Sequence, residues 1–396
     1  MSETWHECWG GRQKCLRHLE RGKVFVRHLR TPGGIALGII SELNLPSTSD
    51  NVVLDGGLFV RIREQERQRK IAWSVVNGAG QSGIRNVLPA KGISTGSYGF
   101  DKAIGVGGVP RGRISEVFGP ASCGKTTLAL QVVASAQKEG AAAAFIDAEH
   151  ALDLRYAGKL GVQVEELIMS KPDCGEQALS VALSLVETGL VGLVVVDSVA
   201  ALVPESELAG EMGEDYFDDI EQMLGKGLRR LELVTFRMGA CVLFTNQIRR
   251  RSYETTGDPD TTAGGRPLRF YASVRMQLSK LEPVFEHGTA IGGRVEMRVI
   301  KNRVASANRS AIAPLIHGEG FSKEMELLEI AASHGVVESS RGDFSYRGNA
   351  LTRSELRADP RLAEELMEEV RASARLMRSK PVARVLASQE TIVQTA

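Results

Sequence analysis

The sequence predicts an α/β fold with a mostly parallel central sheet, preceded by a divergent basic N-terminal segment and followed by a small C-terminal α/β domain with a basic tail. Short apolar runs alternate with amphipathic segments over residues 93–320, and a glycine-bearing turn joins the first run to a helix-like segment. Such runs, with enough chain between them for a crossover helix, are typical of parallel sheets that have helices on both faces. We therefore expect three parts, residues 1–92, 93–320 and 321–396.

The first part, residues 1–92, has an irregular pattern, because Gly-Gly and Pro-Ser breaks interrupt it and its periodicity is weak. Two basic stretches stand out, Arg12–Arg30 and Arg61–Lys70. In the second, Arg63 and Arg67 lie four residues apart, as on one face of a helix. A solvated helical face is the simplest interpretation of both stretches.

Four apolar runs of strand length define the central part. They are Ile114–Phe118, Ala141–Ile146, Leu190–Val196 and Ala240–Thr245. The segments between the first three are long enough for crossover helices, which predicts parallel neighbours in one sheet.

The C-terminal part carries a helix signal. Asp359 and Pro360 suit the N-cap and the first helical position. Leu362, Leu366 and Val370 then recur every four residues, as on the buried face of a helix. We expect a small α/β domain here.

Composition narrows the functional class. The 396 residues are 43% hydrophobic and 24% charged, which allows a sizeable core and excludes wholesale disorder. The formal net charge is only +1, so a nucleic-acid partner has to be bound by local basic surface. The five cysteines lack metal-ligand spacing, which favours a reducing cytoplasm over a disulfide framework or a zinc site. The longest apolar runs are strand-sized, so we expect a soluble protein without a membrane span.

The glycine-bearing turn is a phosphate-binding motif. Residues 119–126 match G-x-x-x-x-G-K-[ST] between a predicted strand and the helix-like run Thr127–Ala136. In this motif backbone N–H groups face phosphates, a lysine reaches the β and γ oxygens, and a hydroxyl binds Mg²⁺; Lys125 and Thr126 take these positions. Cys123 is either a small space-filling residue or, if exposed, a reactive thiol. The predicted ATP-binding residues of the turn are Gly119, Pro120, Ala121, Ser122, Cys123, Gly124, Lys125, Thr126 and Thr127.

Polar side chains follow the other predicted strands at the edge where ligands bind in such sheets. Asp197 ends one run and is a candidate Mg²⁺ ligand, acting through a metal-bound water. Glu149 is the candidate that orients an attacking water, with Asp147, or a structural role for Glu149, as the alternative. Asn246 and Gln247, just after the fourth run, put an amide at the same edge, either to sense a γ-phosphate or to cap the following loop.

Several motifs in order along the chain resemble those of the bacterial RecA recombinase family. They are residues 94–97, 107–114, 119–126, 145–153, 194–202, 245–249, 261–265, 270–275 and 301–303. The resemblance implies a RecA-type P-loop ATPase core that uses ATP and Mg²⁺ and whose hydrolysis depends on DNA. It further implies a helical filament on single-stranded DNA, pairing and strand exchange with homologous double-stranded DNA, and self-cleavage of a LexA-type repressor in the SOS response.

The same resemblance assigns roles by position. Glu149 would activate water, Gln247 would couple the γ-phosphate to the loop after it, and Lys301 and Arg303 would reach the ATP of the neighbouring subunit. Asp153 and Tyr156 match adenine-site positions, and Phe270 matches a subunit contact. The implied DNA-binding residues are Arg229, Arg249, Arg250, Arg251, Tyr253, Gly264 and Gly265.

The sequence departs from the family pattern in four places. Arg249–Arg251 suit phosphate neutralisation, but Ser252 and Thr255–Thr256 replace apolar residues that wedge between bases, so Tyr253 is the remaining candidate for stacking. The other DNA loop, residues 205–219, is more acidic than usual, and acidic groups repel a phosphate backbone. The first 80 or so residues do not resemble the family's N-terminal helix, and the C-terminal end is basic where many members end in an acidic tail.

Two alternatives remain, and the first follows from these departures. One is a RecA-like ATP-binding scaffold or regulatory paralogue without strand-exchange activity, which would keep the phosphate site and lose the wedging loop. The other is a P-loop kinase or transport ATPase, but that class gives no reason for the basic loop after Gln247 or for the pair Lys301 and Arg303.

Overall fold

The computed structural model describes residues 91–211, 216–250, 260–286, 288–340 and 343–379, and the backbone of short strands within residues 1–90. These short strands are β1 (Val24–Phe25), β2 (Leu29–Thr31), β3 (Gly34–Ala36), β4 (Asn51–Leu54) and β5 (Leu58–Arg61). The side chains of residues 249–250, 260–261 and 374–379 also lie outside the description. No helix in the described part of the chain has the length and apolarity needed to cross a membrane.

A ten-stranded sheet forms the centre of the molecule, in the order β10-β9-β11-β12-β8-β14-β15-β16-β17, with β13 paired to β12. Its parallel strands are β8 (Arg113–Gly119), β9 (Ala142–Asp147), β10 (Ile168–Ser170), β11 (Val191–Asp197), β12 (Cys241–Arg250) and β14 (Val274–Glu286). Its antiparallel additions are β13 (Asp260–Thr262), β15 (Thr289–Asn302), β16 (Arg309–Ile316) and β17 (Gly320–Phe321). The predicted mostly parallel sheet is confirmed.

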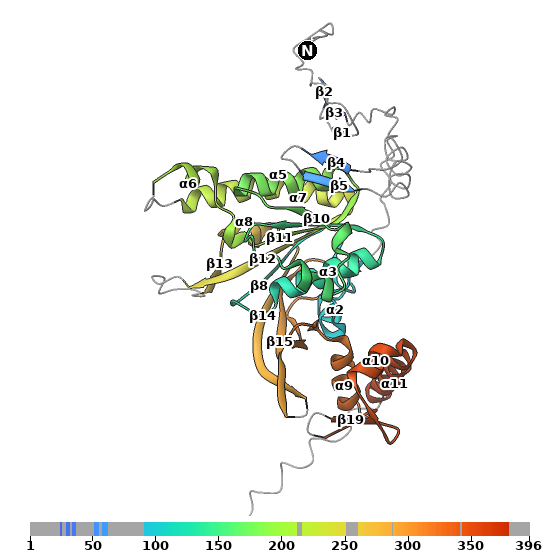
Figure 1. Ribbon diagram of the computed structural model, residues 1–396. Coiled ribbons are helices and arrows are strands. Elements are labelled where there is room, and N and C mark those ends of the chain that lie inside the picture. Colours follow the sequence, from blue (N-terminus) through green and yellow to red (C-terminus); the bar gives the residue numbers. More distant parts are fainter. Residues whose placement is uncertain are drawn as a thin grey trace, which may run out of the picture.

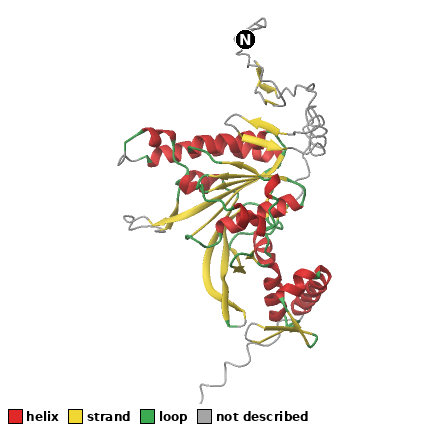
Figure 2. Cartoon of the chain, in the orientation of Figure 1, coloured by secondary structure: helices red, strands yellow, loops and turns green. Residues whose placement is uncertain are grey.

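Helices cover both faces of this sheet (Figures 1 and 2). Successive strand residues face opposite sides, so Val195 packs in the cluster beneath α3 (Lys125–Lys138), and Val194 packs in the cluster beneath α5 (Gly175–Glu187) and α7 (Phe217–Met238). The remaining elements of the core are β6 (Gly92–Ile93), α2 (Tyr98–Ile104), β7 (Val109–Pro110), α4 (Leu154–Lys159), α6 (Glu205–Ala209) and α8 (Arg266–Tyr271), with 3-10 turns at Val164–Glu166 and Val199–Ala201. Burial on both faces explains why the strands are continuous apolar runs.

The C-terminal residues form a small α/β unit with a core of its own. Its elements are α9 (Lys323–Ser333), β18 (Glu338–Ser340), β19 (Asp343–Tyr346), β20 (Asn349–Leu351), α10 (Arg353–Ala358) and α11 (Pro360–Ser379). Oδ1 of Asp359 accepts hydrogen bonds from the N–H groups of Arg361 (2.9 Å) and Leu362 (3.3 Å), which confirms the predicted helix start. Leu366 and Val370 are buried in this core, as their spacing predicts.

Helix α9 docks this unit on the core around the ten-stranded sheet through one buried carboxylate. Glu326 accepts hydrogen bonds from the hydroxyl of Ser97 (3.0 Å) and from the N–H groups of Tyr98 (3.0 Å) and Gly99 (2.6 Å) at the start of α2. Burial raises the pKa of Glu326 to about 7, although these hydrogen bonds act in the opposite direction.

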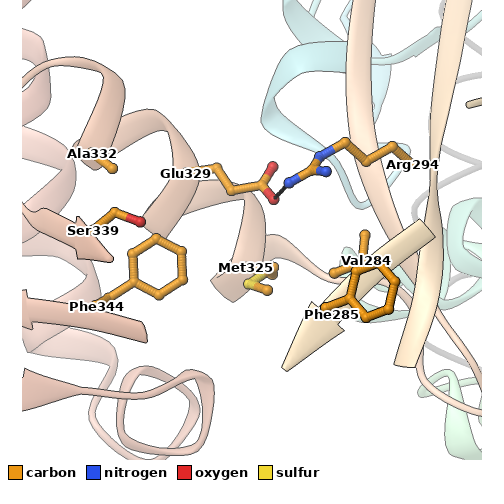
Figure 3. A pocket seen from close by; sticks show the side chains of 8 residues that line it. All are labelled: Val284, Phe285, Arg294, Met325, Glu329, Ala332, Ser339 and Phe344. Carbon is orange, nitrogen blue, oxygen red and sulfur yellow. Dashed lines mark hydrogen bonds and ion pairs between the residues drawn. The ribbon is translucent and has the colours of Figure 1, made fainter. Parts of the chain in front are cut away.

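The β14–β15 hairpin holds the unit from the other side. Arg353 pairs with Glu286 (2.7 Å) and Arg294 pairs with Glu329 (2.7 Å). Between hairpin and unit lies a cavity of about 340 Å³ (Figure 3), whose lining includes Val284, Phe285, Arg294, Met325, Glu329 and Phe344. None of the predicted site residues that the structure describes lines it, so this cavity is separate from the turn between β8 and α3.

Two predicted boundaries are wrong. The fourth strand does not end at Thr245, because β12 pairs with β8 as far as Gln247 and then with β13 from Ile248 onward. Backbone pairing thus continues the strand through polar residues that the apolar pattern had excluded.

The predicted loop 205–219 contains the short helix α6, and it ends in the first turn of α7, where Asp218 and Asp219 lie. Acidic groups are favourable at this end of a helix.

Candidate nucleotide site

The turn between β8 and α3 has the backbone that a phosphate loop needs. Ser122 (φ 56°) and Gly124 (φ 92°) adopt the left-handed conformation, and a Cβ on Gly119 would lie 2.4 Å from the carbonyl oxygen of Leu278. No side chain caps the first turn of α3, so its N–H groups are left for an anion. The ammonium of Lys125 donates to the carbonyl oxygens of Gly119 (3.1 Å) and Pro120 (2.7 Å) along the same turn.

Cys123 lies inside this turn with its side chain fully buried. Burial raises the pKa of its thiol above the ordinary value, which disfavours the reactive thiolate. Of the two sequence interpretations, the space-filling one fits the structure.

A hydroxyl and a carboxylate meet next to the turn. Thr126 Oγ1 donates to Asp197 Oδ2 at 2.7 Å, and Thr245 Oγ1 donates to Asp197 Oδ1. Asp197 is buried, which raises its pKa, while the two hydroxyl donors lower it. Hydroxyl and carboxylate oxygens are the hard ligands that Mg²⁺ prefers, so the residues present fit this ion.

Glu149 follows β9 at the same edge. Its Oε1 accepts hydrogen bonds from the hydroxyl of Ser198 and from Nε2 of Gln247 (3.1 Å). Asp147 is buried, and its carboxylate accepts from the N–H groups of Ala151 (3.1 Å) and Leu152 (3.2 Å), so it holds the backbone around Glu149 in place. This geometry favours Glu149 over Asp147 as the group that meets a water molecule.

The two amides within β12, Asn246 and Gln247, face opposite sides of the sheet. Gln247 reaches Glu149, whereas the buried Asn246 donates to Glu116 Oε1 (2.9 Å) and to the carbonyl oxygen of Ala263 (3.0 Å). Asn246 therefore holds the backbone at Ala263, and of these two amides only Gln247 lies on the side of Glu149.

The predicted adenine-site residues lie beside α3. The hydroxyl of Tyr156 is 3.1 Å from that of Thr127. Asp153 caps α4, since its Oδ1 accepts from the N–H groups of Arg155 (2.8 Å) and Tyr156 (3.2 Å). Asp153 thus places Tyr156 against the phosphate-binding helix.

Lys301, Arg303 and Phe270 lie together on the other face of the sheet. Lys301 Nζ donates to the carbonyl oxygens of Arg269 (2.7 Å) and Phe270 (2.8 Å) in α8, a helix that packs in the cluster beneath α5 and α7. The guanidinium of Arg303 is 5.7 Å from the ring centre of Phe270, which is 64% exposed. Burial, together with nearby Arg303 and Arg275, lowers the pKa of Lys301 to about 8.

The predicted DNA-binding residues divide into three groups. Arg229 is exposed on α7. Gly264 and Gly265 lie before α8 with φ of 78° and 67°, and a Cβ on Gly265 would lie 1.9 Å from Oε1 of Glu221. Arg249 and Arg250 lie at the end of β12 with side chains outside the described part, and Arg251 and Tyr253 lie outside it entirely.

Three features of the site were missed at the sequence level. They are the Thr245 hydroxyl, the Ser198 hydroxyl and the buried pair of Glu116 and Arg275. The available signal was polarity within an apolar strand, because Glu116 interrupts the run Ile114–Phe118 and Thr245 ends the run Ala240–Thr245.

Residues 74–322 match the family model of the RecA N-terminal domain. The chain belongs to the RecA family. Protein RecA of Heliobacterium modesticaldum is 46% identical over 293 residues, covering 72% of this chain and 85% of that protein. Protein RecA of Citrifermentans bemidjiense is 45% identical over 284 residues (70% and 84%), and that of Geobacter sulfurreducens is 43% identical over 317 residues (77% and 94%).

Among solved structures, the RadB recombinase matches with a TM-score of 0.45 and 23% identity, covering 58% of this chain and 98% of that chain.

The RecA family match begins at residue 74, earlier than the resemblance at residue 93 that the motifs predict. ATP binding is a property of the RecA family.

Proposed function

We propose that this chain is a cytoplasmic DNA-dependent ATPase and recombinase. It forms helical filaments on single-stranded DNA, pairs that DNA with a homologous duplex and exchanges strands, and its filament promotes self-cleavage of a LexA-type repressor. The observation that carries the proposal is the pair of carboxylates at the phosphate edge, Asp197 and Glu149, each held by a donor from β12. The division into residues 1–92, 93–320 and 321–396 is part of the same proposal.

The side chains of this site have separable roles in hydrolysis. Lys125 leaves its carbonyl partners to bind the β- and γ-phosphates at the start of α3. Thr126 and Asp197 would hold Mg²⁺, which would neutralise charge on the phosphate oxygens. Glu149 accepts a proton from the attacking water and orients it, and Gln247 holds Glu149 by the 3.1 Å hydrogen bond. Tyr156 and Asp153 border the adenine.

The opposite face of the molecule supplies the filament contact. Lys301 and Arg303 are separated from their own chain's α3 by the sheet, so their proposed target is the nucleotide of the next subunit. Phe270 contributes exposed apolar area to that contact. A head-to-tail contact that does not close produces an open helix, and phosphate near Lys301 would favour its charged form.

Strand β12 connects the nucleotide to DNA. Gln247 contacts Glu149, and the strand ends at Arg250, within a run of three arginines in the sequence whose charges suit a phosphate backbone. Gly264 and Gly265 close the same segment in a conformation that only glycine adopts without strain, and Arg229 adds charge from α7.

One observation favours the scaffold alternative. Asp218 and Asp219 are exposed at the start of α7, and α6 before it is acidic as well, so this edge repels DNA where the recombinase needs attraction. An ATP-binding scaffold would tolerate such a surface.

Replacing Glu149 with glutamine tests the proposed reaction. An amide oxygen still accepts from Ser198 and Gln247, but the variant has no base, so ATP hydrolysis should fall at least about a hundredfold. ATP binding and filaments on single-stranded DNA, seen by electron microscopy, should persist. The matched control is Glu364→Gln, which changes an exposed carboxylate of α11.

Hydrolysis at the wild-type rate by the Glu149→Gln variant would remove Glu149 from the mechanism. Wild-type protein that binds ATP but neither hydrolyses it nor forms filaments on DNA would favour the scaffold instead.

A further inference from the structure

Alternate residues of β12 face α3, and their character changes along the strand. Cys241 and Leu243 pack in the cluster beneath α3. Thr245 and Gln247 continue the same row, and each donates a hydrogen bond to a carboxylate, Thr245 to Asp197 at the end of β11 and Gln247 to Glu149, which follows β9. The row thus changes from packing to hydrogen bonding where it reaches the phosphate edge.

Thr245 is fully buried, and its hydroxyl has a hydrogen-bond partner within the protein, because it donates to Asp197 Oδ1. The other oxygen of the same carboxylate, Oδ2, accepts from Thr126 at 2.7 Å. The two oxygens are therefore divided between a residue of the sheet and the residue that follows Lys125. A buried carboxylate loses stability when one of its oxygens lacks a partner.

This division decides which oxygen faces the start of α3. Thr245 sits on a central strand paired on both sides, to β11 and to β8, so its position is fixed by the sheet. Thr126 sits at the start of α3, at the phosphate loop, where the incoming nucleotide and its metal bind. Because the hydrogen bond from Thr245 fixes Oδ1, the other oxygen, Oδ2, stays directed towards the start of α3.

We propose that Thr245 is a positioning residue for the magnesium site: its hydroxyl holds the Asp197 carboxylate in the orientation that binds Mg²⁺ with Thr126. The proposal rests on the proposed Mg²⁺-dependent nucleotide binding. It makes β12 the strand that positions both carboxylates of the site, one through a hydroxyl and one through an amide.

The test is a Mg²⁺ titration of the binding of a fluorescent ADP analogue by the full chain. Thr245→Val keeps the shape of the side chain and removes the donor, so the Mg²⁺ concentration at half-saturation should rise at least about tenfold. Binding of the analogue in EDTA should not change, and Thr245→Ser should titrate like wild type.

The matched control is Thr235→Val in α7. Thr235 is also fully buried, but its hydroxyl has no hydrogen-bond partner within the described residues. Both substitutions exchange a buried hydroxyl for a methyl group. The control should leave the Mg²⁺ titration unchanged.

The outcomes separate the inference from the function beneath it. Wild-type protein whose nucleotide binding ignores Mg²⁺ would contradict the proposed function. Mg²⁺-dependent wild-type binding with an unchanged titration in Thr245→Val would overturn the role of Thr245 alone. If Thr245→Val does not fold, Thr245→Ser and Thr245→Ala replace it, because both remove the methyl group and only Ala lacks the hydroxyl. An equal titration of these two would overturn the proposal.

Discussion

Replacing Arg275 with methionine tests the buried ion pair that joins three strands of the core. Arg275 on β14 pairs with Glu116 on β8, and their side chains are 7% and 0% exposed. Asn246 on β12 also donates to Glu116, at 2.9 Å, and the guanidinium lies 4.7 Å from the ring centre of Phe118. Asn246 directly precedes Gln247 on β12, so this network is linked to the predicted nucleotide site through one residue of the strand.

The loss of stability expected for Arg275→Met follows from the groups that the substitution leaves without a partner. Methionine fills most of the space of the arginine stem, so little packing is lost. Among the described residues, the carboxylate of Glu116 then keeps only the neutral donor Asn246. Breaking a buried ion pair in this way costs about 3–5 kcal/mol. Replacing Glu116 with glutamine as well removes the stranded charge, so the double variant should regain most of this loss.

The assay is native-state hydrogen exchange of the amides of β8 and β14, which reports the opening free energy of this part of the core. The control is Arg111→Met, because the partly exposed pair of Arg111 and Glu139 (2.8 Å) should contribute about 1 kcal/mol or less. The reasoning would be refuted if Arg275→Met cost no more than this control, or if the double variant were as unstable as the sum of the two single ones.

Three further predictions concern the nucleotide, the DNA and the docking of the C-terminal unit. Lys125→Ala should weaken ATP binding at least about tenfold in an equilibrium titration, because a charged donor to the phosphates is lost; unchanged affinity would contradict the assignment of the turn. Changing Arg249–Arg251 to alanine should make the dependence of log affinity for single-stranded DNA on log salt shallower by up to about 2, whereas an unchanged slope would mean that these arginines do not touch phosphate. Burial raises the pKa of Glu326 from 4.5 to about 7 in the folded protein, so its contribution to stability is full below pH 4.5 and is lost as the pH rises through about 7. The free energy of unfolding of wild type should therefore fall relative to that of Glu326→Gln as the pH rises from 4.5 to about 7. Parallel pH profiles of the two proteins would contradict this.

Local patterns were sufficient to predict much of the fold. The apolar runs at Ile114–Phe118 and Leu190–Val196 reflect strands buried on both faces, and the glycines around Lys125 mark the sharp turn before α3. The helix start at Asp359 and Pro360 could also be predicted, because a cap depends only on residues a few positions apart.

Contacts between distant residues could not be predicted in this way. The strand β12 extends past Thr245 only because β8 and β13 supply backbone partners for polar residues. The bonds of Thr245 to Asp197 and of Arg275 to Glu116 join residues 48 and 159 positions apart, so their polarity is visible in the sequence while their partners are not. Glu326, which caps the start of α2 from α9, is another case of this kind.

The most direct test of the proposed function is ATP hydrolysis by the wild-type chain, with and without single-stranded DNA, at low and at high salt. We expect single-stranded DNA to stimulate hydrolysis strongly and the stimulation to decrease as salt rises, because basic residues after β12 would bind the DNA backbone. Hydrolysis that is indifferent to DNA at both salt concentrations would contradict the recombinase proposal and favour an ATP-binding scaffold.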